Sequence, residues 1–230
     1  MIAISAYLKK LAVTSSDLSF WSDKLQEDFG LRLILDKGVY DASSIARQIY
    51  AILRPVPAPL IKDCGVNTLF LRFLGENKPY YPNHGYYRAA DQSITLNTDI
   101  FYHPDQPDDF FDSRGYFISR AAQTLLHELS HGYDANHGEL SLQPAWMSLS
   151  GWSQTYKPGL KRLLIKDPGA PEVLGEMFYD PHVGAFTRFY AKRNSWDDFA
   201  DSFSMFVGGL KDKVPANKRA YFDKLLAKYK

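Results

Sequence analysis

Cysteine is nearly absent from this sequence. Its 230 residues include one cysteine, Cys64, which excludes an intramolecular disulfide. It also excludes a zinc site built from thiolates, because such a site needs several cysteines. A chain of this length buries a sizeable core without covalent links, so neither absence argues against a stable domain.

A strong net charge and a long apolar run are also missing. Lysine and arginine total 27 against 26 acidic residues, which leaves no electrostatic reason to expect nucleic acid or an anionic membrane as a partner. No apolar run is long enough to span a membrane. Lys9 and Lys10 follow the first apolar stretch, the wrong order for a secretory signal. We therefore expect a cytoplasmic protein, or one exported without a cleaved signal.

Aromatic residues, by contrast, are abundant and make up 15% of the chain, which points to a partly aromatic core. For Trp146 and Trp152, core packing is favoured over the lining of a substrate cleft. Periodicity and turn residues predict helices over 3–12, 16–28, 42–54, 116–131, 182–193, 196–209 and 215–229. They predict strands over 67–74, 85–87 and 93–97, the last two as a hairpin. The proline-rich segment 54–59 is expected to be a stiff connection, and 138–171 mostly irregular. This order indicates an α+β fold with a small sheet and a mostly helical C-terminal half.

One motif carries chemistry. His127 and His131 are four residues apart, so a helix places both imidazoles on one face, where they can share a zinc ion. Glu128 lies beside such a metal without binding it, where it can take a proton from an activated water. Because a chance occurrence of this pattern is rare, the motif predicts a Zn²⁺ site. His84, His103 and His182 have no motif spacing to the pair.

A catalytic zinc site needs a third protein ligand, and two candidates compete. The first lies on the predicted helix 196–209, where Ser195 is the expected cap. Asp197 and Asp201 share one helix face, so Asp197 can reach the metal while Asp201 accepts a hydrogen bond from a histidine ligand. Asp198 is not a proposed ligand, because with Ser195 it is expected to form a capping box. The alternative for the other two acids is that they only complement the helix dipole.

The second candidate is His137, which follows His131 at the spacing of an extended motif with three histidines. That motif has a glycine where this chain has Asp134. Glycine permits the sharp backbone turn that the motif requires, and aspartate adopts such dihedral angles less readily. The residues alone leave both candidates open.

The two segments together resemble the gluzincin metallopeptidases. His127-Glu128-x-x-His131, with Tyr190 followed by Asp197-Asp198-Phe199-Ala200-Asp201, looks like the branch that includes the anthrax lethal factor catalytic domain. The resemblance covers roughly residues 84–209. It implies a zincin-like fold, in which 81–230 form the catalytic region and 1–80 form an N-terminal region of helices and strand, separate or part of the same domain.

The resemblance also implies roles for individual residues. Asp197 is the third zinc ligand, Asp201 orients a ligand, and Tyr190 holds the developing oxyanion. In such peptidases an edge strand beside the active-site helix pairs with an extended substrate, which suggests this role for Ser93–Asn97; a plain half-buried strand is the equal alternative. The family usually has glutamate at both acidic positions, so the shorter Asp197 requires its helix to approach the metal more closely. Relatives of this kind occur in bacterial attack systems, which implies use as an effector or toxin.

The resulting expectation is a zinc-dependent endopeptidase. His127, His131 and Asp197 hold Zn²⁺, Glu128 is the general base, and Tyr190 stabilises the oxyanion. The substrate is a peptide or protein. The alternatives are a metzincin-like site with His137 as third ligand, a catalytically weak module that binds zinc and recognises a partner, and a zinc hydrolase that acts on something other than protein.

Overall fold

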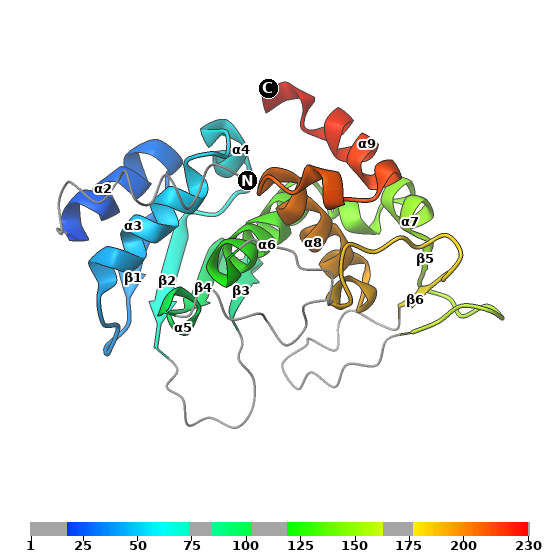
Figure 1. Cartoon of the computed structure of the whole chain (residues 1–230), viewed down its shortest axis with the longest axis horizontal. Coiled ribbons are helices and arrows are strands. Elements are labelled where there is room, and N and C mark those ends of the chain that lie inside the picture. Colours follow the sequence, from blue (N-terminus) through cyan, green and yellow to red (C-terminus); the bar gives the residue numbers. More distant parts are fainter. Residues whose placement is uncertain (1–17, 74–83, 103–118, 163–176, 230) are drawn as a thin grey trace.

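The computed structural model describes residues 18–73, 84–102, 119–162 and 177–229. Its helices are α2 (Leu18–Phe29), α3 (Ala42–Leu53), α4 (Ala58–Asp63), α5 (Asp99–Tyr102), α6 (Arg120–Asn136), α7 (Pro144–Ser150), α8 (Ser195–Val207) and α9 (Ala216–Leu225). Its strands are β1 (Arg32–Leu35), β2 (Thr68–Arg72), β3 (Gly85–Arg88), β4 (Ser93–Asn97), β5 (Trp152–Ser153) and β6 (Phe178–Tyr179). The fold is α+β, which confirms the expected class (Figure 1).

The larger sheet is mixed and has the strand order β1-β2-β4-β3. β1 pairs with β2, and β2 with β4, in parallel. β3 and β4 are antiparallel, with Gly85 opposite Leu96 and Arg88 opposite Ser93, which confirms the predicted hairpin. The edge strand on the side of α6 is therefore β3, with which α6 packs directly.

The prediction that Ser93–Asn97 is the edge strand is wrong. Every residue of β4 is buried, whereas β3 alternates between partly buried and exposed residues. Alternating polar and apolar residues are typical of a strand with one solvated face. Thr95 and Asn97 are nevertheless each only 6% exposed, because β2 and β3 flank β4 and α6 packs across it.

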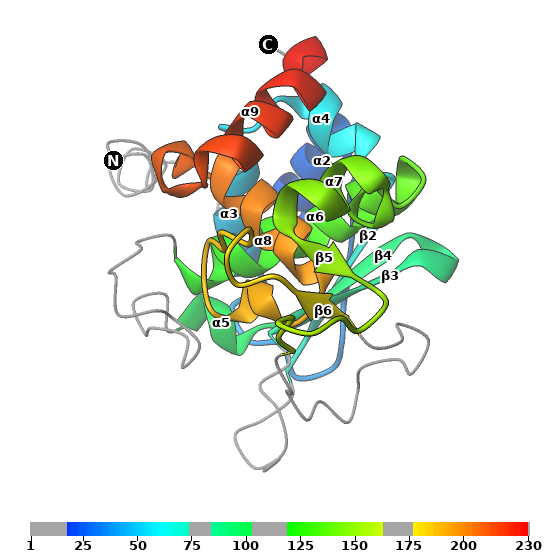
Figure 2. The same cartoon turned by 90° about the vertical axis from the view of Figure 1, so that its right-hand side faces the viewer.

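Helix α6 runs through the middle of the molecule, between the sheet and α8 (Figures 1 and 2). It begins after Ser119, whose side-chain oxygen accepts a hydrogen bond from Ala122 N at 3.2 Å and so satisfies one of the unpaired amides of the first turn. The expected helix over 116–131 is confirmed from Arg120 onward, and residues 116–118 lie outside the described part. The helix extends to Asn136, beyond its predicted end.

Gly132 sets how closely α6 approaches the connection between α4 and β2. A Cβ at this position would lie 2.6 Å from Cys64 O and 2.8 Å from a methyl of Val66. We expect Gly132→Ala to destabilise the protein by about 1–3 kcal/mol, because this overpacking outweighs the better helix propensity of alanine. Chemical denaturation measures the effect. An unchanged or higher stability would mean that α6 moves away at no cost.

Two helices begin at or beside prolines, in segments that were predicted to be a connection or mostly irregular. α7 has Pro144 in its first turn, and α4 follows Pro57 and contains Pro59. Proline is tolerated there, because the amides of the first turn have no partner within the helix. The segment 138–171, expected to be mostly irregular, therefore contains the helix α7. The stiff connection expected over 54–59 is wrong from Ala58, where α4 begins. Strand β1 was not predicted.

The helix expected over 182–193 is also wrong. Residues after Asp180 form a turn, in which Asp180 O accepts from Gly184 N at 2.8 Å and Asp180 Oδ1 accepts from His182 N at 2.8 Å. Only Tyr190–Lys192 is helical, as one 3₁₀ turn, η4. The helices expected over 16–28, 42–54, 196–209 and 215–229 are confirmed as α2, α3, α8 and α9 with small shifts of their ends, and 3–12 lies outside the described residues.

One hydrophobic core joins the sheet and the central helices. Its buried members come from both sides of residue 80 and include Leu25, Ile49, Leu125 and Phe199. The small sheet of β5 and β6 lies at the opposite end of the long axis from α2 (Figure 1). The division at residue 80 stays a prediction. Among the described helices, none has the length and apolar content required to cross a membrane.

Candidate metal centre

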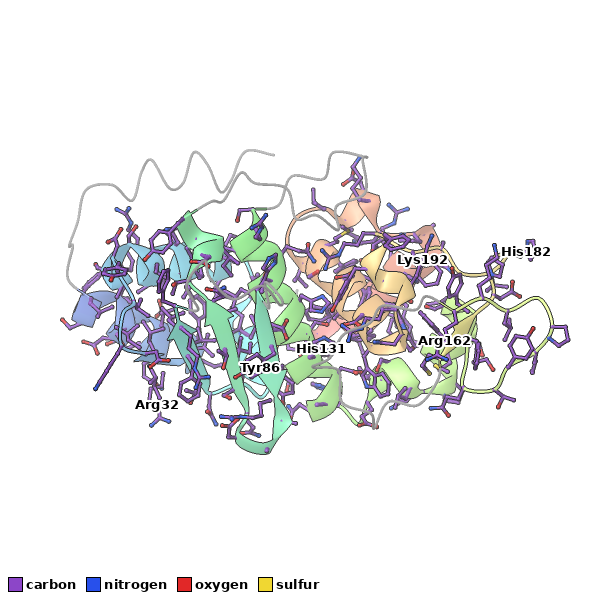
Figure 3. All side chains as sticks on the ribbon, turned by 90° about the horizontal axis from the view of Figure 1, so that it is seen from below. Arg32, Tyr86, His131, Arg162, His182 and Lys192 are labelled. Carbon is purple, nitrogen blue, oxygen red and sulfur yellow. The ribbon has the colours of Figure 1, made fainter. Side chains whose placement is uncertain are left out.

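The predicted site residues come from three elements that meet at the centre of the molecule. Helix α6 carries His127, Glu128 and His131. Helix α8 carries Asp197 and Asp201, and η4 carries Tyr190. Packing of α6 against α8 and of η4 against α8 brings them together. Figure 3 shows His131 on α6, between the sheet that carries Tyr86 and the C-terminal elements.

Three side chains form a compact group of potential metal ligands. His127 Nε2 lies 3.1 Å from His131 Nε2, and Asp197 Oδ1 lies 3.5 Å and 3.6 Å from these two nitrogens. His127 and Asp197 are buried, and the His131 side chain is 21% exposed, so His131 is the member of the group that solvent reaches most. In the part of the chain that the structure describes, this is the one such group.

The triangle has the dimensions of a tetrahedral zinc site. Two ligand atoms bound to one zinc ion at about 2.0–2.1 Å, at the tetrahedral angle, lie about 3.3 Å apart. The three observed edges of 3.1, 3.5 and 3.6 Å scatter around that value. Two imidazole nitrogens and one carboxylate oxygen are also a donor set that zinc favours, so the residues fit the metal.

Asp197 reaches the histidines because the first turn of α8 aims its carboxylate. Asn194, not Ser195 as predicted, is the N-cap: its Oδ1 accepts from Asp197 N at 2.7 Å. Its Nδ2 donates to Asp197 Oδ2 at 2.7 Å, which leaves Oδ1 facing the histidines. Burial raises the pKa of Asp197, but hydrogen bonds and charge from His127 and His131 outweigh it and hold that pKa well below its usual range.

Asp201 orients His127 through the ring nitrogen that does not face the metal group. His127 Nδ1 lies 2.7 Å from Asp201 Oδ1, and Arg188 Nε donates to Asp201 Oδ2 at 2.6 Å, with a second bond from the guanidinium to Oδ1. When the His127 ring is neutral, as a metal ligand must be, an ionised Asp201 accepts the Nδ1 proton and the lone pair lies on Nε2, which faces Asp197. Burial lowers the pKa of His127, but bonds to Asp197 and Asp201 raise it overall to about 10. The pocket therefore stabilises positive charge, whether a proton or a metal cation.

Glu128 and Tyr190 flank the triangle. Glu128 is 7% exposed, and its charge raises the pKa values of both His127 and Tyr190. The Tyr190 ring lies 5.9 Å from that of His127, between centroids. Burial, the largest cause, raises the pKa of Tyr190, so its hydroxyl stays protonated at neutral pH and is a hydrogen-bond donor.

His137 does not join the group. Its Nδ1 lies 2.8 Å from Tyr133 O, its Nε2 lies 3.1 Å from Asp63 Oδ2, and its ring stacks on Tyr133. Because α6 continues to Asn136, His137 lies about 240° around the helix axis from His131. Asp134, at the position of the motif glycine, stays helical and its Oδ1 accepts from Ser141 N at 2.7 Å.

Asp198 and the two tryptophans belong to the core behind the site. Asp198 pairs with Lys218, both fully buried, and accepts from Trp152 Nε1 at 3.0 Å. Trp146 is fully buried and its ring lies 5.0 Å from that of Phe199. Core packing of Trp146 and Trp152 is therefore confirmed, and Asp198 points away from the metal group.

Sequence reasoning missed three residues that support the site, namely Arg188, Arg193 and Asn194. Asn194 had a signal, because asparagine directly before a predicted helix is a favoured N-cap. The two arginines had none, since they lie where a continuous helix was expected. The backbone there forms turns in place of that helix. Arg188 donates to Asp201, and Arg193 donates to Tyr190.

Comparison with known proteins gives a distant structural likeness. No family model matches the chain, and no curated protein matches it. Among solved structures, the chain is similar to a "putative zinc-binding metallo-peptidase" from Bacteroides caccae ATCC 43185, with 12% identity and a TM-score of 0.44 over 94% of this chain and 85% of that one. The resemblance to the lethal factor branch stays a prediction.

Proposed function

We propose that this chain is a zinc-dependent endopeptidase. The observation that carries the proposal is the triangle of His127 Nε2, His131 Nε2 and Asp197 Oδ1, with edges of 3.1, 3.5 and 3.6 Å. These three residues would hold Zn²⁺ and leave one tetrahedral position for water or substrate. A zinc ion bound there supplies Lewis acidity, which polarises a carbonyl and acidifies a water.

The protein's own groups then handle the protons and the developing charge. Glu128 accepts the proton of the attacking water and passes it to the leaving amine. Asp201, held by Arg188, keeps the His127 ring in one tautomer and orientation during this transfer. Tyr190 donates a hydrogen bond to the oxyanion that forms on the scissile carbonyl.

The proposed substrate is an extended peptide or protein segment that pairs with β3, in place of the β4 pairing expected from sequence. β3 is the outer strand of the described sheet on the side of α6, and Tyr86 on it is 39% exposed. An added strand would gain main-chain hydrogen bonds while alternate side chains enter pockets. The absence of nucleic-acid and membrane partners, and an effector or toxin role, stay predictions.

Metal removal tests the function directly. Purified protein is assayed for zinc per chain and for cleavage of casein before EDTA treatment, after it, and after zinc is restored. We expect about one zinc per chain, loss of cleavage on removal and recovery on reloading, because three ligands suffice for one ion. Zinc without cleavage of casein or of a mixed peptide library would instead favour a weak binding module. Cleavage of small esters alone would favour a non-protein substrate, and a zinc-free protein would exclude the proposal.

A further inference from the structure

Tyr190 and Arg193 lie side by side because of the local backbone. In a 3₁₀ turn, side chains three residues apart lie one above the other. Tyr190 opens η4 and Arg193 follows its last residue, with Arg193 N donating to Tyr190 O at 3.0 Å. The Arg193 guanidinium consequently reaches the phenol: Nη1 donates to Tyr190 Oη at 2.6 Å, and Cζ lies 5.6 Å from the ring centroid.

The same guanidinium faces the candidate metal ligand. Arg193 Nε lies 3.6 Å from Asp197 Oδ2, and the Arg193 side chain is only 15% exposed. The planar guanidinium has donors in fixed directions, so one group can contact a carboxylate and a hydroxyl together. Its orientation is thus determined from two sides, by α8 and by η4.

This contact constrains the hydroxyl proton of Tyr190. Arginine only donates hydrogen bonds, so Tyr190 Oη accepts from it and the phenolic hydrogen cannot point toward Arg193. A hydroxyl that accepts a charge-assisted bond is also polarised, which makes its own hydrogen a stronger donor. We propose that Arg193 is a positioning residue for catalysis, which directs and strengthens the hydrogen bond from Tyr190 to the substrate oxyanion.

The inference rests on the proposed peptidase function and adds a second residue to its oxyanion site. Its distinctive consequence concerns the rate per bound zinc, on which Arg193 acts through the Tyr190 hydroxyl. Its contact with Asp197 would instead change the amount of zinc bound. Removing Arg193 should therefore matter when that hydroxyl is present and should matter little when it is absent. A purely structural role of Arg193 has no such dependence.

A double-mutant cycle on casein cleavage measures this dependence, with kcat expressed per bound zinc. Arg193→Met retains the aliphatic stem and removes the guanidinium. We expect kcat to fall about 100-fold for Tyr190→Phe, about tenfold for Arg193→Met, and about 100-fold for the double variant, since the two act as one unit. KM should change little in the single variants, because the bond forms on the oxyanion and not on the ground-state carbonyl.

Lys192→Met is the matched control. It removes the same charge one residue earlier, where Lys192 Nζ lies over the Phe189 ring, and we expect kcat within about twofold of wild type, as for other surface charges. Arg193→Lys should recover part of the loss, because it keeps a donor without the guanidinium geometry.

Three results would overturn the inference. The first is a tenfold loss from Arg193→Met in the Tyr190→Phe background as well. The second is a loss of kcat in Lys192→Met as large as that in Arg193→Met. The third is an unchanged kcat in Arg193→Met. In all three the wild type still cleaves casein, so the proposed function stands. A zinc-loaded wild type that cleaves no peptide overturns the function and this inference together.

Discussion

Glu128→Gln should abolish nearly all peptidase activity while the protein keeps its zinc. Glutamine has the same shape but cannot accept the proton of the attacking water. Removal of a general base costs about 10²–10⁴-fold in rate, so we expect kcat near the lower end of what is measurable. Zinc per chain should match the wild type, because Glu128 lies outside the three-ligand group. The measurement is the initial rate of casein cleavage per bound zinc.

The control for this variant is Glu27→Gln. It is the same substitution on the exposed face of α2, where Glu27 pairs with Lys24, and it should leave the rate unchanged. If Glu128→Gln kept more than about a tenth of the wild-type rate with zinc bound, Glu128 could not be the general base, since that factor lies below the range for such residues.

Asp197→Ala should lose zinc. Changes to residues that only orient a ligand already weaken metal binding about 10–100-fold, so removal of a ligand should weaken it by at least about a hundredfold. The substitution also leaves Asn194 Nδ2 without its buried acceptor. Metal analysis after dialysis, and competition with a chelator of known affinity, measure the change.

His137→Ala is the informative partner of Asp197→Ala. His137 bonds to Tyr133 O and Asp63 away from the triangle, so this variant should keep its zinc and lose at most some stability. The reverse pattern, with zinc lost in His137→Ala and kept in Asp197→Ala, would restore the metzincin-like reading. The pair therefore separates the two ligand sets that the sequence left open.

The candidate metal-ligand motif was predictable because helix periodicity is a local property. Four-residue spacing places His127 beside His131, and Asp197 beside Asp201, whatever the rest of the chain does. The predicted helices that carry them are present as α6 and α8. The α+β class was predictable for the same reason, since strand and helix patterns are read over short windows.

The helix ends and the short helices were less predictable. Asp134 is compatible with either a turn or a helix. In the structure Asp134 is helical, and its carboxylate accepts a hydrogen bond from Ser141, a residue outside α6. Because α6 continues past Asp134 to Asn136, His137 lies on a different face from His131. Pro144 reads as a breaker in sequence, yet it starts a helix where the packing of Trp146 supports one.

Local sequence thus determined which residues of each helix share a face, and with that the pairing of His127 with His131. Only the tertiary structure decided which third residue meets them and which strand is the edge. The tertiary structure also places the Arg188 guanidinium within hydrogen-bond distance of Asp201. The physical reason is that helix periodicity acts over a few residues, whereas the packing of α6 against α8 and against the sheet joins residues far apart in the chain. Such contacts depend on how the whole core is buried, which no short window of sequence contains.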